Sequence, residues 1–257
     1  MKTIITVTGI RPDFIRMSEI FKKLDKNFNH ILIHTGQHYD DHLSKIFFKE
    51  FKIRKPDYNL NIGNKKNEHY HQLSILSVKF IELLKKKKIN PNLIIFLGDS
   101  NSVGLSFFLK KEGYKIAHIE AGMRSYDDRM LEEINRKVCD HCSDFLFVYH
   151  QDYKKNLLKE NINKNKIFVV GNTIVEPSRF FLNNIKNLNY NLDFILIDIH
   201  RPENFKYKER LVNIFKFINF CKLKFNKRAV FLKFGRTMEY IKKYKINTNG
   251  INFIPLM

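Results

Sequence analysis

Runs of apolar residues alternate along the chain with longer stretches in which apolar residues recur at helical spacing. The runs are mostly continuously apolar, which is typical of parallel strands covered on both faces. In the first two thirds of the chain they predict strands at residues 4–7, 31–33, 93–97, 116–119, 145–148 and 167–170. Amphipathic stretches predict helices between them, among others at residues 12–24, 70–84 and 153–160. This alternation indicates a doubly wound parallel α/β sheet with right-handed crossovers.

A second series of the same kind follows Asn172. It predicts strands at residues 194–197, 229–232 and 251–254, and helices at 174–185, 207–225 and 237–244. We expect two α/β domains, residues 1–172 and residues 173–257. The second series holds few strands for a closed sheet, so we expect the second domain to be incomplete.

Composition excludes several classes of protein. The 257 residues are 44% hydrophobic, which is too rich for a disordered chain. No apolar run approaches the ~20 residues that span a bilayer, and the first residues are typical of a strand rather than of a signal peptide. Three cysteines, Cys139, Cys142 and Cys221, are too few for a disulfide framework. We therefore expect a cytoplasmic protein with no membrane partner.

The net charge of the chain does not change these conclusions. Lys and Arg number 46 and Asp and Glu 26, so the net charge is 46 − 26 = +20, which would suit nucleic acid. The excess is spread along the chain, and its densest run, residues 85–88, ends a helical pattern, where cations complement the helix dipole. We interpret the charge as solvated faces and expect no nucleic-acid partner. A basic nucleic-acid-binding module is kept as an alternative that predicts salt-sensitive binding.

Polar residues follow the predicted strands, where ligands of open α/β sheets bind. After the first strand, Gly9 permits a sharp turn and Arg11 and Arg16 lie near a helix N-terminus, which favours anions. The second strand runs into Gln37 and His38. The alternative for the first segment is a simple turn with two solvated arginines.

Carboxylates and further arginines follow the later strands. Asp99 comes after Gly98, and its alternative role is a helix N-cap. Glu120 ends the next strand and Arg124 follows it. Glu132 and Arg136 are neighbours one helical turn apart, for which a surface salt bridge is the alternative.

An imidazole and another guanidinium, His200 and Arg201, follow a strand of the second series. Carboxylates beside arginines are tuned as acids or bases, and arginines orient a diphosphate. The set therefore predicts proton abstraction or elimination on a phosphorylated, polar substrate.

Competing motifs are weak. Cys139 and Cys142 have metal or redox spacing, but there is no second pair and the pattern falls on a helix. Dinucleotide, P-loop and Gly-x-Ser-x-Gly motifs are absent from the sequence. We predict no metal and no cofactor.

Seven segments, in order and spread over most of the chain, resemble the non-hydrolysing UDP-N-acetylglucosamine 2-epimerases. They are Gly9-Ile10-Arg11-Pro12-Asp13, Thr35-Gly36-Gln37-His38-Tyr39, Gly98-Asp99-Ser100-Asn101-Ser102, His118-Ile119-Glu120-Ala121-Gly122-Met123-Arg124, Glu132-Glu133-Ile134-Asn135-Arg136, Val170-Gly171-Asn172-Thr173 and His200-Arg201-Pro202-Glu203-Asn204. The resemblance implies two Rossmann-like domains of the GT-B type, a UDP-sugar bound between them, and a homodimer if the second domain is completed.

The resemblance also implies roles. The C2 proton of the amino sugar is removed, UDP departs by elimination to 2-acetamidoglucal, and UDP is added back after protonation on the other face. By position, Asp99, Glu120 and Glu132 resemble the acid/base carboxylates, and His200 resembles the residue that assists departure of the diphosphate. Arg11 matches an arginine that contacts phosphate or substrate. The substrate-binding candidates are Arg11, Arg16, Gln37, His38, Arg124, Arg136 and Arg201.

The chain departs from the family pattern at several positions. Arg16 stands where lysine is common, and Pro202 where arginine is common. Phe234-Gly235-Arg236-Thr237 falls where relatives often carry His-Pro-Arg-Thr. The family continues beyond residue 257 with segments that hold the uridine and diphosphate, so we expect a C-terminally truncated member.

The leading hypothesis is an enzyme that interconverts UDP-GlcNAc and UDP-ManNAc, or related UDP-2-acetamido sugars, for surface-polysaccharide synthesis. A hydrolysing 2-epimerase that releases ManNAc and UDP is an alternative, which product analysis distinguishes. A silent, truncated remnant that binds a partner is another, which turnover excludes.

Overall fold

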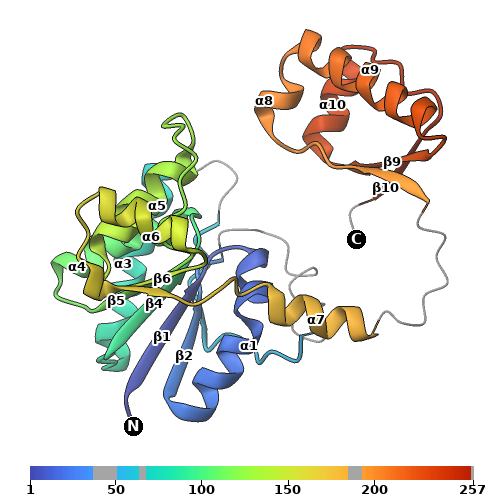
Figure 1. Cartoon of the computed structure of the whole chain (residues 1–257). Coiled ribbons are helices and arrows are strands. Elements are labelled where there is room, and N and C mark those ends of the chain that lie inside the picture. Colours follow the sequence, from blue (N-terminus) through green and yellow to red (C-terminus); the bar gives the residue numbers. More distant parts are fainter. Residues whose placement is uncertain (37–50, 64–67, 185–192, 256–257) are drawn as a thin grey trace. The chain divides into compact units, whose positions relative to one another are not determined.

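The computed structural model describes residues 1–36, 51–63, 68–184 and 193–255. The chain divides into two compact units, Met1–Lys186 and Asn187–Met257 (Figure 1). Among the described helices, none has the length and apolar character needed to cross a bilayer. Each unit has its own hydrophobic core.

The first unit is built on a parallel sheet in the order β3-β2-β1-β4-β5-β6-β7. Its strands are β1 (Thr3–Thr8), β2 (Asn29–His34), β3 (Tyr58–Asn59), β4 (Leu93–Leu97), β5 (Ile116–Ile119), β6 (Phe145–Val148) and β7 (Ile167–Val169). The chain winds outward from β1 to β3 and then resumes at β4, on the other side of β1. This reversal makes the carboxyl ends of β1 and β4 the topological switch point, where open α/β sheets bind ligands.

Helices cover both faces of this sheet. They are α1 (Arg11–Asn27), α3 (His69–Lys87), η1 (Asn101–Gly104), α4 (Leu105–Lys111), α5 (Leu131–Cys142), α6 (Gln151–Lys159), η2 (Lys164–Lys166) and α7 (Val175–Asn184). Phe14, Met17 and Phe21 of α1 are buried against one face. Phe80 of α3 and Leu109 of α4 are buried against the other.

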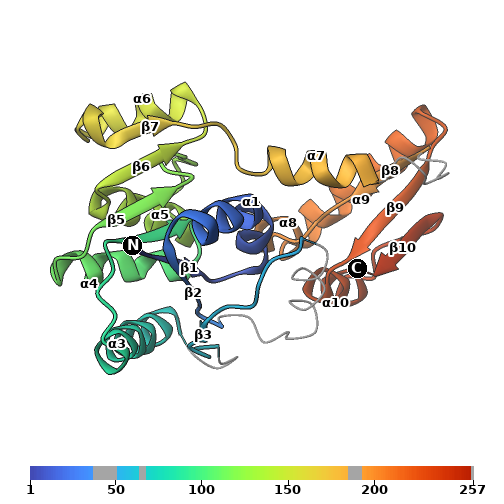
Figure 2. The same cartoon turned by 90° about the horizontal axis from the view of Figure 1, so that it is seen from below.

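Alternate strand residues supply the two faces. Ile5 and Val7 belong to the cluster under α3 and α4, whereas Ile4 belongs to the cluster under α1. When both faces of a strand are buried, most of its residues are apolar. This explains why the predicted strands are mostly continuous apolar runs. Figures 1 and 2 both show α7 beside α1, where Lys23 forms an ion pair with Glu176.

The second unit is a three-stranded parallel sheet in the order β10-β9-β8. Its elements are β8 (Phe194–Ile197), α8 (Pro202–Phe205), α9 (Lys208–Lys224), β9 (Arg228–Lys233), α10 (Gly235–Lys243) and β10 (Ile251–Pro255). Its core joins Phe205, Phe215 and Ile241, one from each helix, to Phe231 of the sheet. The described helices of this unit thus pack on one face of its sheet (Figure 1).

The predicted fold class, an α/β chain with Rossmann-like parallel sheets, is confirmed. Helices cover both faces of the first sheet, whereas the described helices of the second unit lie on one face of its sheet. The structure groups α7 with the first unit, so the units divide after Lys186 rather than after Asn172. The reason is the packing of α7 on α1, including Lys22 above the ring of Phe180. The prediction missed β3 and α8, which are two and four residues long.

Gly122, in the turn after β5, is fixed by a close backbone approach. Its φ is +76°, and a Cβ there would lie 2.4 Å from the carbonyl oxygen of Tyr153. Gly113 has a similar φ of +84°, but a Cβ there would meet nothing within 4 Å among the described residues. Replacing Gly113 by alanine therefore tests only the left-handed backbone, whereas replacing Gly122 tests the left-handed backbone and the contact together.

We expect Gly113→Ala to lower the free energy of unfolding by about 1–2 kcal/mol, the cost of the left-handed backbone for alanine. Gly122→Ala should lower it by about 1–3 kcal/mol more, because the new methyl group meets a backbone atom that is held in α6. Urea denaturation of both variants measures the difference. Equal losses would show that the contact at Gly122 relaxes without cost.

Candidate active site

The turn between β1 and α1 is closed by Asp13. Its Oδ2 accepts the backbone N–H groups of Gly9 (2.8 Å) and Ile10 (3.1 Å), while Pro12 fits the first helical turn. Burial raises the pKa of Asp13 to about 6, although the two N–H groups and Arg16 oppose the rise. Oδ1 of Asp13 is buried without a hydrogen-bond partner in the described part of the chain.

Arg16, in α1, links this turn to Glu120 through its guanidinium group. Its Nη2 lies 3.6 Å from Asp13 Oδ1, and its Nη1 donates to Oε2 of Glu120. Glu120 is 8% exposed and has a φ of +74°. A non-glycine residue is rare in this conformation, which marks a locally strained backbone. Tyr149, which follows β6, donates its hydroxyl to the same Oε2 (3.3 Å).

Asp99 is held in the same way from another helix. Nη2 of Arg136, in α5, donates to Oδ2 of Asp99. A Cβ on Gly98 would lie 3.2 Å from Nη2 of Arg16, so the Arg16 guanidinium lies over the backbone that precedes Asp99. The Asp99 and Glu120 ion pairs therefore lie beside each other at the ends of β4 and β5.

Glu133 organises the loop that leads into α5. Its carboxylate accepts the backbone N–H of Ser125 (2.8 Å), the Ser125 hydroxyl (2.9 Å) and the backbone N–H of Tyr126 (3.3 Å), and it pairs with Arg136 (3.2 Å). Burial opposes ionisation, but these hydrogen bonds outweigh it and lower the pKa of Glu133. Glu132 is exposed in the first turn of the helix. The predicted pairing of Arg136 is thus made with Glu133, not with Glu132.

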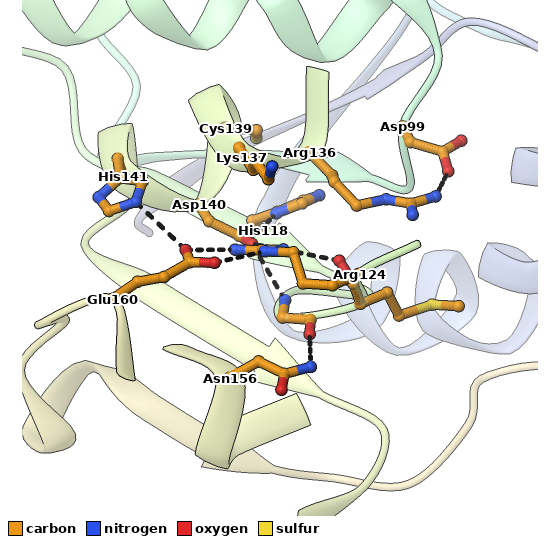
Figure 3. Close-up of polar contacts among 12 residues, drawn as sticks. Asp99, His118, Arg124, Arg136, Lys137, Cys139, Asp140, His141, Asn156 and Glu160 are labelled. Carbon is orange, nitrogen blue, oxygen red and sulfur yellow. Dashed lines mark hydrogen bonds and ion pairs between the residues drawn. The ribbon is translucent and has the colours of Figure 1, made fainter. Parts of the chain in front are cut away.

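A buried charge network lies under this loop (Figure 3). Nδ1 of His118 lies 2.6 Å from Asp140, and its Nε2 lies 2.8 Å from the carbonyl oxygen of Gly98. Burial would lower the pKa of His118, but the contacts with Cys139 and Asp140 outweigh it and raise the pKa well above its ordinary value. The Gly98 carbonyl and the Asp140 carboxylate can only accept, so Nε2 donates to the first and Nδ1 to the second. The imidazole therefore holds the backbone next to Asp99.

Arg124 completes the network. It donates two hydrogen bonds of 2.7 Å to Glu160, contacts Asp140 at 2.8 Å and donates to the Met123 carbonyl at 2.6 Å. The side chain is fully buried. The guanidinium faces the carboxylates of Asp140 and Glu160 and ties the loop to them. Its expected role in substrate binding stays a prediction.

The remaining predicted site residues are Arg11, Gln37, His38, His200 and Arg201. Gln37 and His38 lie outside the described residues, and Arg11 is described only by its backbone, at the start of α1. His200 and Arg201 belong to the second unit and are exposed at the end of β8.

His200 is oriented within its own unit. Its Nδ1 lies 2.6 Å from Oδ1 of Asp198. The ring of Phe234, where relatives of the resembled family often carry histidine, lies 5.2 Å from the His200 ring centre. Arg201 approaches Glu203 at 3.7 Å.

Arg16 and Arg136 both contact carboxylates of the site, Arg16 that of Glu120 and Arg136 that of Asp99. Their expected role in substrate binding stays a prediction. The sequence prediction did not name Tyr149 and Glu133 as site residues; they contact Glu120 and Arg136. Tyr149 is the polar residue directly after a predicted strand, and that signal could have identified it. Nothing in the sequence distinguishes Glu133 from the adjacent Glu132.

Metal chemistry has no visible basis in the described ranges. No group of three or more His, Cys, Asp or Glu side chains in them is arranged to hold a metal ion. Cys139 and Cys142 are free thiols on α5, and Cys139 is buried. The site is therefore a set of paired carboxylates and guanidinium groups.

Comparison with known proteins assigns this arrangement to a family. The family model described as UDP-N-acetylglucosamine 2-epimerase matches residues 22–256. The chain belongs to the UDP-N-acetylglucosamine 2-epimerase family. It is 38% identical over 255 residues to the UDP-N-acetylglucosamine 2-epimerase of Methanocaldococcus jannaschii, covering 93% of this chain and 68% of that protein. It is 35% identical to the UDP-2,3-diacetamido-2,3-dideoxy-D-glucuronate 2-epimerase of Pseudomonas aeruginosa, covering 84% of this chain and 62% of that one.

Solved structures agree with this family assignment. The M. jannaschii UDP-GlcNAc 2-epimerase in complex with UDP-GlcNAc and UDP superimposes with a TM-score of 0.86 at 36% identity, covering 99% of this chain and 73% of that chain. The Neisseria meningitidis enzyme bound to UDP-GlcNAc has a TM-score of 0.86 at 25% identity. The chain thus spans about two thirds of the length of its curated epimerase relatives.

The raised pKa of Asp13 gives a pH dependence of stability. Because the folded-state value, about 6, lies above the ordinary 3.8, its contribution favours folding below pH 3.8 and is lost as the pH rises through 6. Asp13→Asn removes this titration. We expect its stability relative to the unmodified chain to improve from pH 4 to pH 7, by up to about 3 kcal/mol. Urea denaturation at both pH values measures it, and a pH-independent difference would contradict the assignment.

We expect Arg124→Met to lower the free energy of unfolding by about 3–5 kcal/mol, because it removes the buried guanidinium that pairs with both Asp140 and Glu160. The matched control is Arg129→Met, since Arg129 is 90% exposed in its pair with Asp127; its loss should stay under about 1 kcal/mol. Thermal and urea unfolding measure both. A loss for Arg124→Met no larger than that of the control would contradict a structural role for this arginine.

Proposed function

We propose that the chain is a nucleotide-sugar 2-epimerase that interconverts UDP-GlcNAc and UDP-ManNAc, or a related pair of UDP-2-acetamido sugars. The observation that carries the proposal is the pairing of Asp99 and Glu120 with arginines, side by side at the switch point, in a member of this family. The complexes of two relatives with UDP-GlcNAc support the choice of substrate class. The P. aeruginosa relative, named for a diacetamido uronate, is the reason for leaving the sugar open within that class.

The proposed reaction is an elimination followed by re-addition. A carboxylate removes the C2 proton, the C–H electron pair forms the C1=C2 double bond of 2-acetamidoglucal, and the C1–O bond breaks with its electrons leaving on UDP. Protonation of C2 from the opposite face and return of UDP to C1 give the epimer. Atoms and charge balance without an external oxidant or reductant, which agrees with a site made of acids and bases.

Roles follow from placement. We assign Asp99, Glu120 and Glu132 as the acid and base groups, because two are held by arginines at the strand ends and the third is exposed on α5. A C2 proton is weakly acidic, so its base must be accurately placed. His200, oriented by Asp198, is assigned to the departing diphosphate. The substrate-binding candidates remain Arg11, Arg16, Gln37, His38, Arg124, Arg136 and Arg201.

The cellular setting is part of the proposal. The three free cysteines suit a reducing cytoplasm, and the product class suits the supply of precursors for surface polysaccharides. A homodimer is proposed from the family resemblance. The spread of charge along the chain supports a UDP-sugar rather than nucleic acid as partner.

Incubation with UDP-GlcNAc in deuterated water tests the reaction. We expect deuterium at C2, detected by NMR and mass spectrometry, together with UDP-ManNAc. Asp99→Asn and Glu120→Gln should each reduce the exchange rate by about 10²–10⁴, the usual contribution of one acid or base group. Glu112→Gln, an exposed carboxylate at the end of α4, is the matched control and should exchange normally.

The products separate the remaining alternatives. Free ManNAc with UDP would indicate a hydrolysing epimerase. Absence of exchange, together with absence of a UDP-dependent thermal shift, would reject the proposal for this chain and favour a silent remnant. Salt-sensitive binding to DNA or RNA would favour the nucleic-acid alternative.

A further inference from the structure

Glu120 is the last acceptor in a chain of hydroxyl groups that begins outside the sheet. The Tyr149 hydroxyl lies 3.3 Å from Glu120 Oε2 and 2.8 Å from the Thr173 hydroxyl. Thr173 belongs to the Val170-Gly171-Asn172-Thr173 segment, which leads from β7 to α7. This segment is one of the seven that resemble the epimerase family, and none of its residues is among the acid, base or substrate-binding candidates.

The direction of the chain follows from proton counting. Burial, and then the nearby charge of Glu120, raise the pKa of Tyr149 above its ordinary value, so the phenol keeps its proton. A carboxylate only accepts, so that proton is donated to Glu120. The Tyr149 oxygen is then an acceptor toward Thr173, whose hydroxyl donates to it. Successive donation of this kind strengthens each hydrogen bond.

Both donors of Glu120 converge on one oxygen. Arg16, from α1, and Tyr149, from the end of β6, each donate to Oε2. Oε1 has no hydrogen-bond partner among the described residues. Because one oxygen is held from two elements, the carboxylate plane is fixed and the other oxygen is left for a substrate proton.

We propose that Tyr149, itself oriented by Thr173, is a positioning residue that fixes the Glu120 carboxylate with Oε1 available to the sugar. The proposal deepens the proposed function and rests on it for the identity of the reaction. It gives the Thr173 segment a role, since a shift of that segment would reach Glu120 through two hydrogen bonds.

Carbon-13 NMR tests the geometry without any turnover. Side-chain carboxyls labelled with ¹³C are recorded at one fixed pH, with Glu120→Gln identifying the Glu120 signal. Tyr149→Phe should shift that signal, because it removes one of the two hydrogen bonds to Oε2. Tyr207→Phe, at a tyrosine that is 65% exposed in the second unit, should leave it unchanged. An unshifted Glu120 signal in folded Tyr149→Phe overturns the proposal.

Exchange of the C2 hydrogen tests the catalytic consequence. Tyr149→Phe should lower kcat for exchange by about 10- to 100-fold, part of what a complete acid or base group supplies, with a smaller change in KM. An effect on KM alone, with kcat unchanged, would contradict the positioning role.

Thr173 provides a second pair of variants that leave the aromatic ring in place. Thr173→Val removes the donor and should reproduce part of both effects, whereas Thr173→Ser keeps the hydroxyl and should restore them. Equal behaviour of the two variants contradicts the hydroxyl chain. If the unmodified chain fails to exchange, the proposed function fails, but the carboxyl ¹³C shift still decides whether Tyr149 positions Glu120.

Discussion

Two carboxylates lie at the ends of adjacent buried strands, and an arginine from a helix forms an ion pair with each one. Parallel strands gather their carboxyl ends at one edge, and the switch point opens that edge between β1 and β4. Each pair fixes the position of its carboxylate, because a guanidinium holds a carboxylate oxygen with directed N–H donors. The order of the elements explains these contacts. Because α1 follows β1 and α5 follows β5, both helices begin near the carboxylates with which their arginines pair.

The site also depends on buried groups that hold the backbone around the carboxylates. The His118 imidazole ties the Gly98 backbone to Asp140, and Arg124 ties Asp140 to Glu160, so β4, the loop after β5, α5 and α6 are joined by one network. Networks of this kind are costly when any member is missing, because the rest are left buried and unpaired. Such rigidity is what an acid or base needs when the bond to be broken is as weakly acidic as a sugar C–H.

Much of the fold was predictable because it follows from local pattern. The strands at 93–97, 116–119 and 145–148 were predicted with the bounds that the structure has, since a strand buried on both faces is apolar throughout. β3 was not predictable, because two residues carry no periodicity and their pairing is set by the β2 edge. Of the candidate site, Asp99 and Glu120 followed from the strand-end rule. The role of Arg124 did not, because its partner Glu160 lies 36 positions away and a buried arginine looks like a solvated one in sequence.

The left-handed backbone of Glu120 carries an evolutionary consequence. A side chain in that conformation costs free energy that glycine would avoid and asparagine would reduce. A chain released from selection for chemistry would gain stability by exchanging this glutamate, and single nucleotide changes readily supply glycine. The carboxylate of this chain has two donors aimed at it. In a homologue that carries out no chemistry, glycine or asparagine would be the more stable choice at this position, so the residue found there is a simple marker of whether the acid or base group is present.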